Sequence, residues 1–331
     1  MLLEGDRMIR RMVLTFGEPL AVFAHKGRDG LAVSRDFQMD CAGAELNTAI
    51  ALARLKVEVA YAAALGADPF GDFILRELRA EQVDVSRVEQ VESISTGVLF
   101  KMTSGLREDP SVMYYRKNTP MALGRWTGGG CAHELHLGHF SWVHATGIVW
   151  MVSEETRAHA QQIVQTAFEN GTPVSFDINL RLKMAELSAW QQVLIEVLPY
   201  LRWLMIGDTE ARQLFGTDQA SDVDAAIKQW GFRGEGLVLK AGAKGATVYR
   251  DGGTHHVKAW PVERVVDTVG AGDGFNAGFI AGLLKEWGME ETLTLASLIG
   301  AHAVTSKGDS SGYPMWSSVE SMLKGDGEVT R

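Results

Sequence analysis

The sequence alternates short apolar runs with segments of helical periodicity along most of its length. Several runs have the length and composition of buried strands, at residues 12–17, 141–148, 173–179, 203–208 and 236–242. Helical spacing of apolar residues occurs between them, at 44–56, 69–82, 154–170, 188–198 and 221–231. This alternation predicts an α/β fold with a doubly wound, mainly parallel sheet flanked by helices. Ligands of such sheets bind beyond the carboxyl ends of the strands.

Two segments in the first third of the chain interrupt the alternation. Residues 20–38 and 95–117 carry alternating side chains around turns with glycine or proline, which is typical of β-hairpins. We expect the hairpins to pair in a small β-sheet lid over the strand ends, and two separate surface hairpins are the alternative. The sequence predicts one α/β domain at residues 12–325 after an N-terminal extension at 1–11. The lid segments are inserted in this domain at about 20–40 and 95–118.

The composition limits the classes of partner. The chain has 331 residues, 46% of them apolar, which is enough for a large core. Its formal net charge is -9, and no run of Lys and Arg is long enough to follow nucleic acid or bind an anionic membrane. Two cysteines are too few for a disulfide framework and indicate a reducing compartment. Because no segment has the character of a signal peptide or membrane span, we expect a cytoplasmic protein with small-molecule ligands.

The segment VVDTVGAGDGFNAGF, residues 265–279, contains the clearest functional signal. Its pattern predicts a strand over 262–268 and a helix that begins near Asp273. The glycines leave backbone amides open at the helix start, where the helix dipole favours an anion. Amides beside a carboxylate suit phosphoryl transfer, because amides neutralise phosphoryl oxygens while the carboxylate orients the acceptor hydroxyl and takes its proton. The alternative is structural, with Asp273 as a helix cap and the later glycines as packing positions.

Other ligand motifs are absent from the sequence. Phe275 breaks the G-x-G-x-x-G dinucleotide pattern, and no Gly-Lys-Ser/Thr follows to make a Walker loop. An NAD-dependent oxidoreductase is poorly supported, because the chain lacks a glycine-rich first βα turn with a later acidic partner. Cys131 and the histidines that follow it lack the spacing of a zinc motif, and we expect them in a polar loop before the strand at residue 141.

Three segments resemble the ribokinase-like carbohydrate kinases, the phosphofructokinase-B family. DTVGAGDGF (267–275) resembles the C-terminal signature, AGAELNTAIALARL (42–55) the N-terminal signature, and LGADPFGDFI (65–74) the element after the second core strand. Their order and separation cover nearly the whole chain. The resemblance implies a ribokinase-like fold, ATP and Mg²⁺ as cofactors, Asp273 as the catalytic base, and an anion hole formed by the amides of Gly270, Ala271 and Gly272.

Two further segments, MYYRK (113–117) and DINLR (177–181), resemble the 2-keto-3-deoxygluconate kinases within this family. The resemblance implies phosphorylation of a sugar acid, most like 2-keto-3-deoxygluconate to its 6-phosphate. The implied substrate contacts are Gly43, Asn47, Phe100, Tyr114, Arg116, Arg181 and Asp309. A guanidinium at Arg116 suits a planar carboxylate, which a neutral sugar lacks. The alternatives are a charge that protects a strand edge, a fructokinase or ribokinase type of neutral-sugar kinase, and a sugar-binding sensor on the same fold.

The nucleotide side of the resemblance rests on a second glycine turn, KAGAKGA (240–246), for which an ordinary hairpin turn is the alternative. The implied ATP contacts are Asn179, Lys240, Gly242 and Gly245. Glu210 is implied as a magnesium ligand through water, although GDTE here puts Gly207 where the family often has Asn. The family's glycine pair is Ala42-Gly43 in this chain.

Two properties stay open at this point. A monovalent cation such as K⁺ near Asp267 occurs in parts of the family, and the sequence does not decide whether it is needed here. A small open lid sheet has unpaired edges and an apolar face, which predicts a homo-oligomer, a dimer through the lid.

Overall fold

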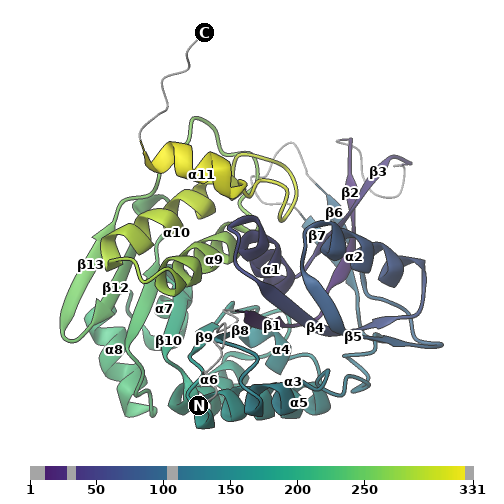
Figure 1. The fold of residues 1–331 in the computed structure, drawn as a ribbon, viewed down its shortest axis with the longest axis horizontal. Coiled ribbons are helices and arrows are strands. Elements are labelled where there is room, and N and C mark those ends of the chain that lie inside the picture. Colours follow the sequence, from purple (N-terminus) through teal and green to yellow (C-terminus); the bar gives the residue numbers. More distant parts are fainter. Residues whose placement is uncertain (1–11, 28–34, 103–110, 325–331) are drawn as a thin grey trace, which may run out of the picture.

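A long, mostly parallel sheet runs through the centre of the molecule (Figure 1). The computed structural model describes residues 12–27, 35–102 and 111–324. The nine-stranded sheet has the order β13-β12-β11-β10-β9-β8-β1-β4-β5. Its strands are β1 Val13–Phe16, β4 Val59–Gly66, β5 Asp84–Val91, β8 Trp142–Thr146, β9 Val174–Asp177, β10 Trp203–Gly207, β11 Gly236–Lys240, β12 Ala246–Arg250 and β13 Gly253–Val257.

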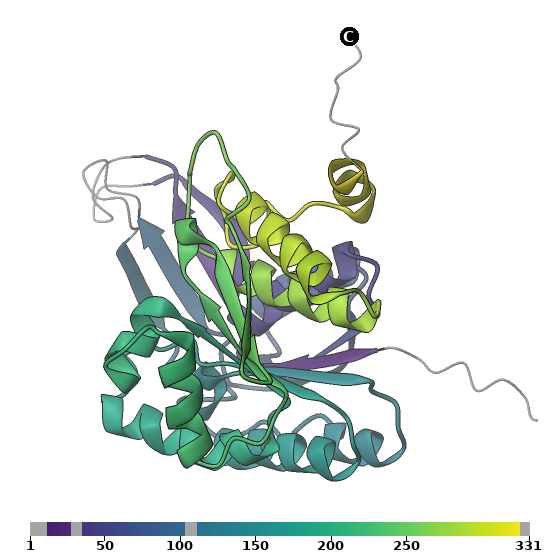
Figure 2. The ribbon, with the colours of Figure 1, turned by 90° about the vertical axis from the view of Figure 1, so that its left-hand side faces the viewer.

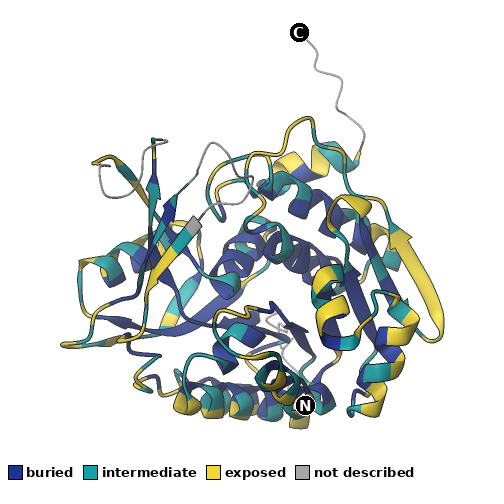
Figure 3. Cartoon of the chain, turned by 180° about the vertical axis from the view of Figure 1, so that it is seen from behind, coloured by how far each residue is buried: buried dark blue, intermediate teal, exposed yellow. Residues whose placement is uncertain are grey.

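The strands from β5 to β11 pair in parallel, whereas β12 and β13 pair antiparallel at one edge. Every residue of β1, β4, β8 and β9 is buried, as a parallel strand covered on both faces requires. By contrast, β13 at the edge is largely exposed (Figure 3). The predicted fold class is confirmed.

Helices cover both faces of this sheet (Figures 1 and 2). One layer contains α1 Ala44–Arg54, α2 Pro69–Ala80, α9 Ala271–Leu284 and α10 Met289–Ala303, with α11 Trp316–Leu323 beyond α10. The other helices are α3 Cys131–His136, α4 Gly147–Trp150, α5 Glu154–Glu169, α6 Leu187–Val197, α7 Asp208–Phe215 and α8 Ala220–Gln229. None of the helices in the described part of the chain has both the length and the apolar character needed to span a bilayer.

The two predicted hairpins form one separate four-stranded sheet, the lid, with the order β3-β2-β6-β7. The strands are β2 Leu20–His25, β3 Phe37–Ala42, β6 Val98–Met102 and β7 Ser111–Tyr115. Each hairpin is antiparallel, and β2 pairs with β6 in parallel, so the hairpins are joined as predicted. Leu20, Val22 and Leu99 are buried together on one face of the lid.

Two sequence predictions were wrong in detail. Residues 262–268 form no strand, because Val265 and Val266 are exposed and the amide of Val266 bonds to the carbonyl of Val304 beyond α10 instead of to a sheet edge. The segment after Cys131 forms the short helix α3 and not a loop. An alternating apolar pattern predicts a strand only where a neighbouring strand offers an edge.

Candidate active site

The loop before α9 ends in a turn that only glycine can make. Gly270 is the N-cap of α9 in the left-handed region, with φ 82°, and no side chain caps the helix. A Cβ at Gly270 would lie 2.0 Å from the carbonyl oxygen of Asp309, and the Tyr313 hydroxyl donates to the Gly270 carbonyl at 2.7 Å. In this first turn the Ala271 amide makes only a long bond of 3.4 Å to the Thr268 carbonyl, and no backbone partner of the Gly272 amide is found among the described residues, so this helix start can bind an anion.

Asp273 lies in this first turn and is 8% exposed. Its Oδ2 accepts a hydrogen bond from Asn47 Nδ2 of α1 at 2.8 Å, so the side chain faces α1 instead of capping its own helix. Burial raises the pKa of Asp273 to about 7, and the charge of Asp177 acts in the same direction, although the Asn47 bond lowers it. A carboxylate with this pKa is matched to accepting a hydroxyl proton near neutral pH.

A lysine lies beside the same helix start. Lys240, at the end of β11, donates to Asp177 Oδ2 at 2.6 Å and to Asn276 Oδ1 at 3.2 Å. A Cβ at Gly272 would be 3.4 Å from Lys240 Nζ, which places the ammonium against the open amides. Asn276 also donates to Asp177 at 2.7 Å, so the three side chains form one buried network. The ammonium and the amides together make this corner favourable for phosphate oxygens.

Asp177 and Asn276 were not among the sequence-predicted site residues. Asp177 is the last residue of β9, at the carboxyl end where ligands bind, and Asn276 is one helical turn after Asp273. The end of a buried strand and a helix position one turn after Asp273 were the sequence features that could have identified Asp177 and Asn276 as site residues. Asp177 is 2% exposed, and its Oδ1 has no hydrogen-bond partner among the described residues.

The predicted magnesium residue Glu210 is held by backbone amides. Its Oε1 accepts from Leu180 at 2.8 Å and its Oε2 from Gly207 at 2.7 Å, at the start of α7. Burial raises the pKa of Glu210. Asn179, next to Leu180, is 7% exposed and has φ 48°, a left-handed conformation that Asn tolerates better than most residues. Gly207 thus supplies a backbone amide at the position where the family often has an Asn side chain.

A bound Mg²⁺ fits this corner through oxygen atoms. The unpaired Oδ1 of Asp177 and the carboxylate of Glu210 offer the oxygen donors that Mg²⁺ prefers. Within the described residues no group of three or more His, Cys, Asp or Glu side chains is arranged to hold a metal ion. Mg²⁺ usually keeps several waters and substrate phosphates as ligands, so it would need only one or two protein carboxylates here.

The KAGAKGA segment is a hairpin connection, as the structural alternative predicted. It joins the antiparallel strands β11 and β12 through a short 3₁₀ turn, Gly242–Lys244. Gly245 has φ 95°, and a Cβ there would lie 1.9 Å from the Val257 carbonyl oxygen, so the turn packs tightly on the end of β13. Gly242 has φ 54° and nothing within 4 Å of its built Cβ, which leaves its surface open. The hairpin geometry does not exclude a nucleotide beside it.

A pocket lies along the segment that precedes the α9 loop. It lies between the irregular segment 260–266 and the end of α10, and its lining residues are Trp260, Pro261, Val262, Glu263, Arg264, Val266, Ala301, His302 and Thr305. The segment is tied to α10 because the Trp260 amide donates to Ser297 Oγ at 2.8 Å. The segment that lines the pocket continues along the chain into the loop before Gly270.

Arg116 pairs with a carboxylate of the protein itself. Its guanidinium contacts Oε2 of Glu18, whose other oxygen accepts from Thr119. The exposed fractions of the two side chains are 18% for Arg116 and 2% for Glu18. The guanidinium is thus held against the interior, which is not the arrangement of a solvated charge at a strand edge. Gly43, the N-cap of α1, lies next to this pair, since its Cβ would be 3.2 Å from the Glu18 carbonyl oxygen.

The lid brings only some of the predicted substrate residues together. Tyr114 is opposite Leu99 and therefore shares the face of Leu99 and Lys101. Phe100 points to the other face, where it stacks on Phe23 with a centroid distance of 5.4 Å. The structure does not bring Phe100 to the face of Tyr114. The alternation of side chains along paired strands could have shown that Phe100 and Tyr114 lie on opposite faces of the lid.

The remaining predicted residues lie around Asp273. Arg181 is exposed, and its charge lowers the pKa of Asp273, which indicates that it is close. Asp309 Oδ1 accepts from Lys101 at 3.0 Å. Sequence reasoning missed Glu45, a buried residue of α1 whose Oε1 accepts from Thr146 at 2.5 Å. Burial raises the pKa of Glu45 to about 7, and the charge of Asp273 raises it further.

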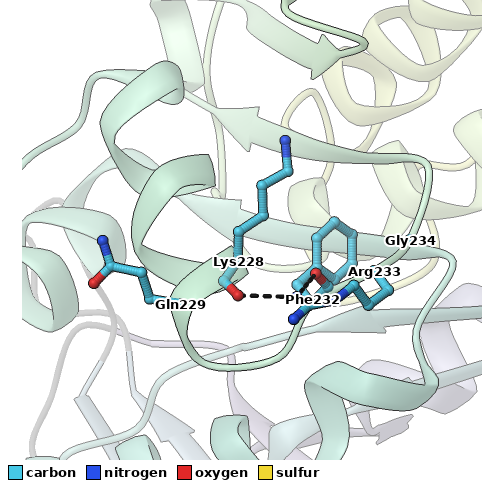
Figure 4. Close-up of a pocket in the computed structure, with 5 residues that line it drawn as sticks. All are labelled: Lys228, Gln229, Phe232, Arg233 and Gly234. Carbon is cyan, nitrogen blue, oxygen red and sulfur yellow. Dashed lines mark hydrogen bonds between the residues drawn. The ribbon is translucent and has the colours of Figure 1, made fainter.

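Two other features do not belong to this site. His144 is enclosed in β8, its Nδ1 is 2.9 Å from Ser175 Oγ, and burial lowers its pKa to about 4, which makes it a core histidine. A surface depression near the end of α8 is lined by Lys228, Gln229, Phe232, Arg233 and Gly234 (Figure 4). There Arg233 donates to the carbonyls of Lys228 and Phe232 at 2.9 and 2.7 Å. That depression contains none of the residues described above.

Comparisons with known proteins agree with this geometry. A profile of the "pfkB family carbohydrate kinase" matches residues 11–316. The chain is 34% identical over 315 residues to the 2-dehydro-3-deoxygluconokinase of Bacillus subtilis (strain 168), covering 94% of each chain. It is 29% identical over 326 residues to the 2-dehydro-3-deoxygluconokinase of Thermoproteus tenax, covering 97% of each. The solved structure of a PfkB protein from Polaromonas sp. JS666 is 30% identical, with a TM-score of 0.80 over 93% of this chain and 98% of that one. The chain therefore belongs to the pfkB family of carbohydrate kinases.

Proposed function

We propose that this carbohydrate kinase transfers the γ-phosphoryl group of ATP to the 6-hydroxyl of 2-keto-3-deoxygluconate, which is also called 2-dehydro-3-deoxygluconate. One observation carries the proposal: the buried carboxylate of Asp273 and the uncapped helix start at Gly270 to Gly272 occupy the same turn, with the Lys240 ammonium beside Gly272. A base for the hydroxyl and hydrogen-bond donors for the phosphoryl oxygens thereby lie at the same helix start. The names of the two curated relatives support the sugar acid as substrate.

In the proposed reaction Asp273 orients the sugar hydroxyl and accepts its proton. The hydroxyl oxygen forms a bond to the γ-phosphorus while the bond from that phosphorus to the β,γ-bridging oxygen breaks, and ADP leaves. The α9 amides and Lys240 stabilise the negative charge on the transferred phosphoryl oxygens. Because the transition state is loose, the position of the hydroxyl matters more than the strength of the base. Asn47 holds the carboxylate in place for this role.

ATP is proposed to bind between the glycine turn and α10. The open face of Gly242 and the pocket at 260–266 offer a surface for the nucleoside, and the phosphates then reach the α9 amides. Asn179, Lys240 and Gly245 are the other proposed ATP contacts. Mg²⁺ would be held by Asp177 and Glu210 through water, and when bound it neutralises charge on the phosphates.

Arg116 is proposed to recognise the substrate carboxylate. Its guanidinium has a fixed position because Glu18 holds it, and a fixed fork suits a planar carboxylate. The other proposed sugar contacts are Gly43, Asn47, Tyr114, Arg181 and Asp309. We leave Phe100 out because it faces the other side of the lid. A neutral-sugar kinase is the second candidate, since Arg116 already has an internal partner in Glu18.

A coupled ADP-release assay tests the substrate directly. We expect 2-keto-3-deoxygluconate or its galactonate epimer to have a higher kcat/KM than fructose or ribose. Arg116→Ala should raise KM for the sugar acids and leave KM for the neutral sugars unchanged. Arg125→Ala, at an exposed arginine, is the matched control and should change neither. A wild-type preference for a neutral sugar, or an equal effect of Arg116→Ala on all four sugars, would refute carboxylate recognition.

We also propose a homodimer formed through the lid, in the cytoplasm. The lid face that carries Phe100 also carries Met39, Met113 and Tyr115, which are 40%, 39% and 59% exposed. Such an apolar sheet face is typical of an interface. The free, buried thiols of Cys41 and Cys131 fit a reducing compartment. Light scattering of wild type and Met113→Asp tests the dimer, because only the wild type should have twice the mass of the chain.

A further inference from the structure

A lysine of the lid is buried between two aspartates of the main domain. Lys101, on β6, is 7% exposed. Its ammonium lies 2.6 Å from Asp267 Oδ2 and 3.0 Å from Asp309 Oδ1. The side chains of these two aspartates are 8% and 12% exposed. Burial alone would lower the pKa of Lys101, yet the two aspartates raise it above its ordinary value, so the lysine is charged.

These two aspartates flank the loop that makes the anion hole. Asp267 begins the segment that leads into Gly270, and its Oδ1 accepts from the Val269 amide at 3.2 Å. Asp309 packs on Gly270 from the other side, because its carbonyl oxygen would be 2.0 Å from a Cβ there. A positive charge between Asp267 and Asp309 therefore fixes the two segments on which Gly270 depends.

The pfkB resemblance raises the question of a monovalent cation at Asp267, and the residues present do not fit one. The Oδ2 of Asp267 already holds a positive charge, the Lys101 ammonium at 2.6 Å, while Oδ1 accepts a neutral amide at 3.2 Å. A monovalent cation bound to Asp267 would have to share this carboxylate with the ammonium, whose charge repels it at close range. A buried ammonium with two carboxylate partners supplies the same single positive charge without a diffusible ion.

We propose that Lys101 is a built-in replacement for a monovalent cation at the anion-hole loop, so that this enzyme needs no K⁺ for its folded loop or its activity. Because Lys101 belongs to β6 of the lid, the position of this strand affects the conformation of the loop at Gly270. Only the activity part of this inference rests on the proposed kinase function. Lys101 is a positioning residue, since it acts on the phosphoryl site through Asp267 and Asp309.

A third carboxylate lies close enough to matter. Asp40, on β3, has its Oδ2 3.0 Å from the position of a Cβ at Gly308, and its Oδ1 accepts from the Cys41 amide at 2.8 Å. Burial raises the pKa of Asp40. Lys101 already faces two carboxylates, and an ionised Asp40 adds a third negative charge, so the comparison of ions also tests whether a diffusible cation binds here together with Lys101.

The test compares ions at constant ionic strength. Thermal unfolding of the full chain without substrates is measured in KCl, NaCl, methylammonium chloride and tetramethylammonium chloride. We expect the wild type to have the same Tm in KCl, NaCl and tetramethylammonium chloride. Lys101→Met should have a lower Tm, and K⁺ or methylammonium should raise it, whereas the bulky tetramethylammonium should not. Lys26→Met, at an exposed lysine of the lid, is the control and should behave like the wild type.

A second variant covers the possibility that Lys101→Met does not fold. Lys101→Met combined with Asp267→Asn removes one buried charge together with its partner, and it should recover Tm without gaining a response to K⁺. The inference is overturned if K⁺ raises the Tm or the kcat of the wild type above the value in tetramethylammonium. It is also overturned if Lys101→Met responds equally to all four ions. Because Tm is measured without sugar or ATP, failure of the proposed substrate would leave this result interpretable.

Discussion

The catalytic carboxylate is expected to destabilise the folded protein, and its removal makes this measurable. Burial raises the pKa of Asp273 from 3.8 to about 7. The folded state therefore holds this proton more tightly than the unfolded chain does. As the pH rises from about 4 to about 7 the unfolded chain releases the proton first, so the free energy of unfolding falls across this window.

The expected size follows from the two pKa values. A difference of about three pH units corresponds to roughly 4 kcal/mol of unfolding free energy above pH 7 and roughly 2 kcal/mol at pH 5.5. Asp273→Asn removes the titration and keeps an oxygen that accepts from Asn47. The variant should be more stable than the wild type by about these amounts, while its kcat falls by about 100-fold to 10,000-fold. Greater stability with lost turnover is the pattern expected of a strained catalytic group.

Urea unfolding at pH 5.5 and pH 8 measures this prediction. The buried indoles of Trp126, Trp190 and Trp203 report the transition by fluorescence. Asp36→Asn, at an exposed carboxylate, is the matched control and should change stability little at either pH. The reasoning is refuted if Asp273→Asn is no more stable than the wild type at pH 8, or if its gain is the same at both pH values.

Two further changes test the surroundings of Asp273. Asn47→Ala removes a hydrogen bond that lowers the pKa of Asp273, so the acidic limb of the kcat/KM profile should move up by about 1 to 2 pH units. If the acidic limb does not move, the hydrogen bond from Asn47 does not control the pKa of the catalytic base. Gly270→Ala places a Cβ 2.0 Å from the Asp309 carbonyl oxygen at φ 82°, so both Tm and kcat should fall. Gly252→Ala, a control with φ 75° and nothing within 4 Å, should lower only Tm, because about 1 kcal/mol of backbone strain is added without a clash.

The repeating pattern of the sequence was enough for the architecture. Fully apolar runs at a βα pitch specify a parallel sheet buried on both faces, and β1, β4, β8 and β9 have that burial. The lid hairpins followed from alternation around turns. The pattern failed at 262–268, where alternating residues lie beside α10 and find no strand partner. The periodicity of apolar residues shows which side of a segment is apolar. It does not show which helix or strand packs against that side.

For the active-site loop, too, some features follow from the sequence alone and others only from the tertiary structure. By itself, the sequence determined that residues 270–273 turn into a helix with open amides and a carboxylate, because glycine spacing and helix periodicity are local properties. Only the tertiary structure decided the partners: Asn47 on Asp273 across 226 residues, Lys240 on Asp177, and Lys101 between two aspartates. Those contacts depend on how the sheet, helices and lid pack against one another. Packing also sets the burial that raises the pKa of Asp273 and makes an ordinary aspartate a base.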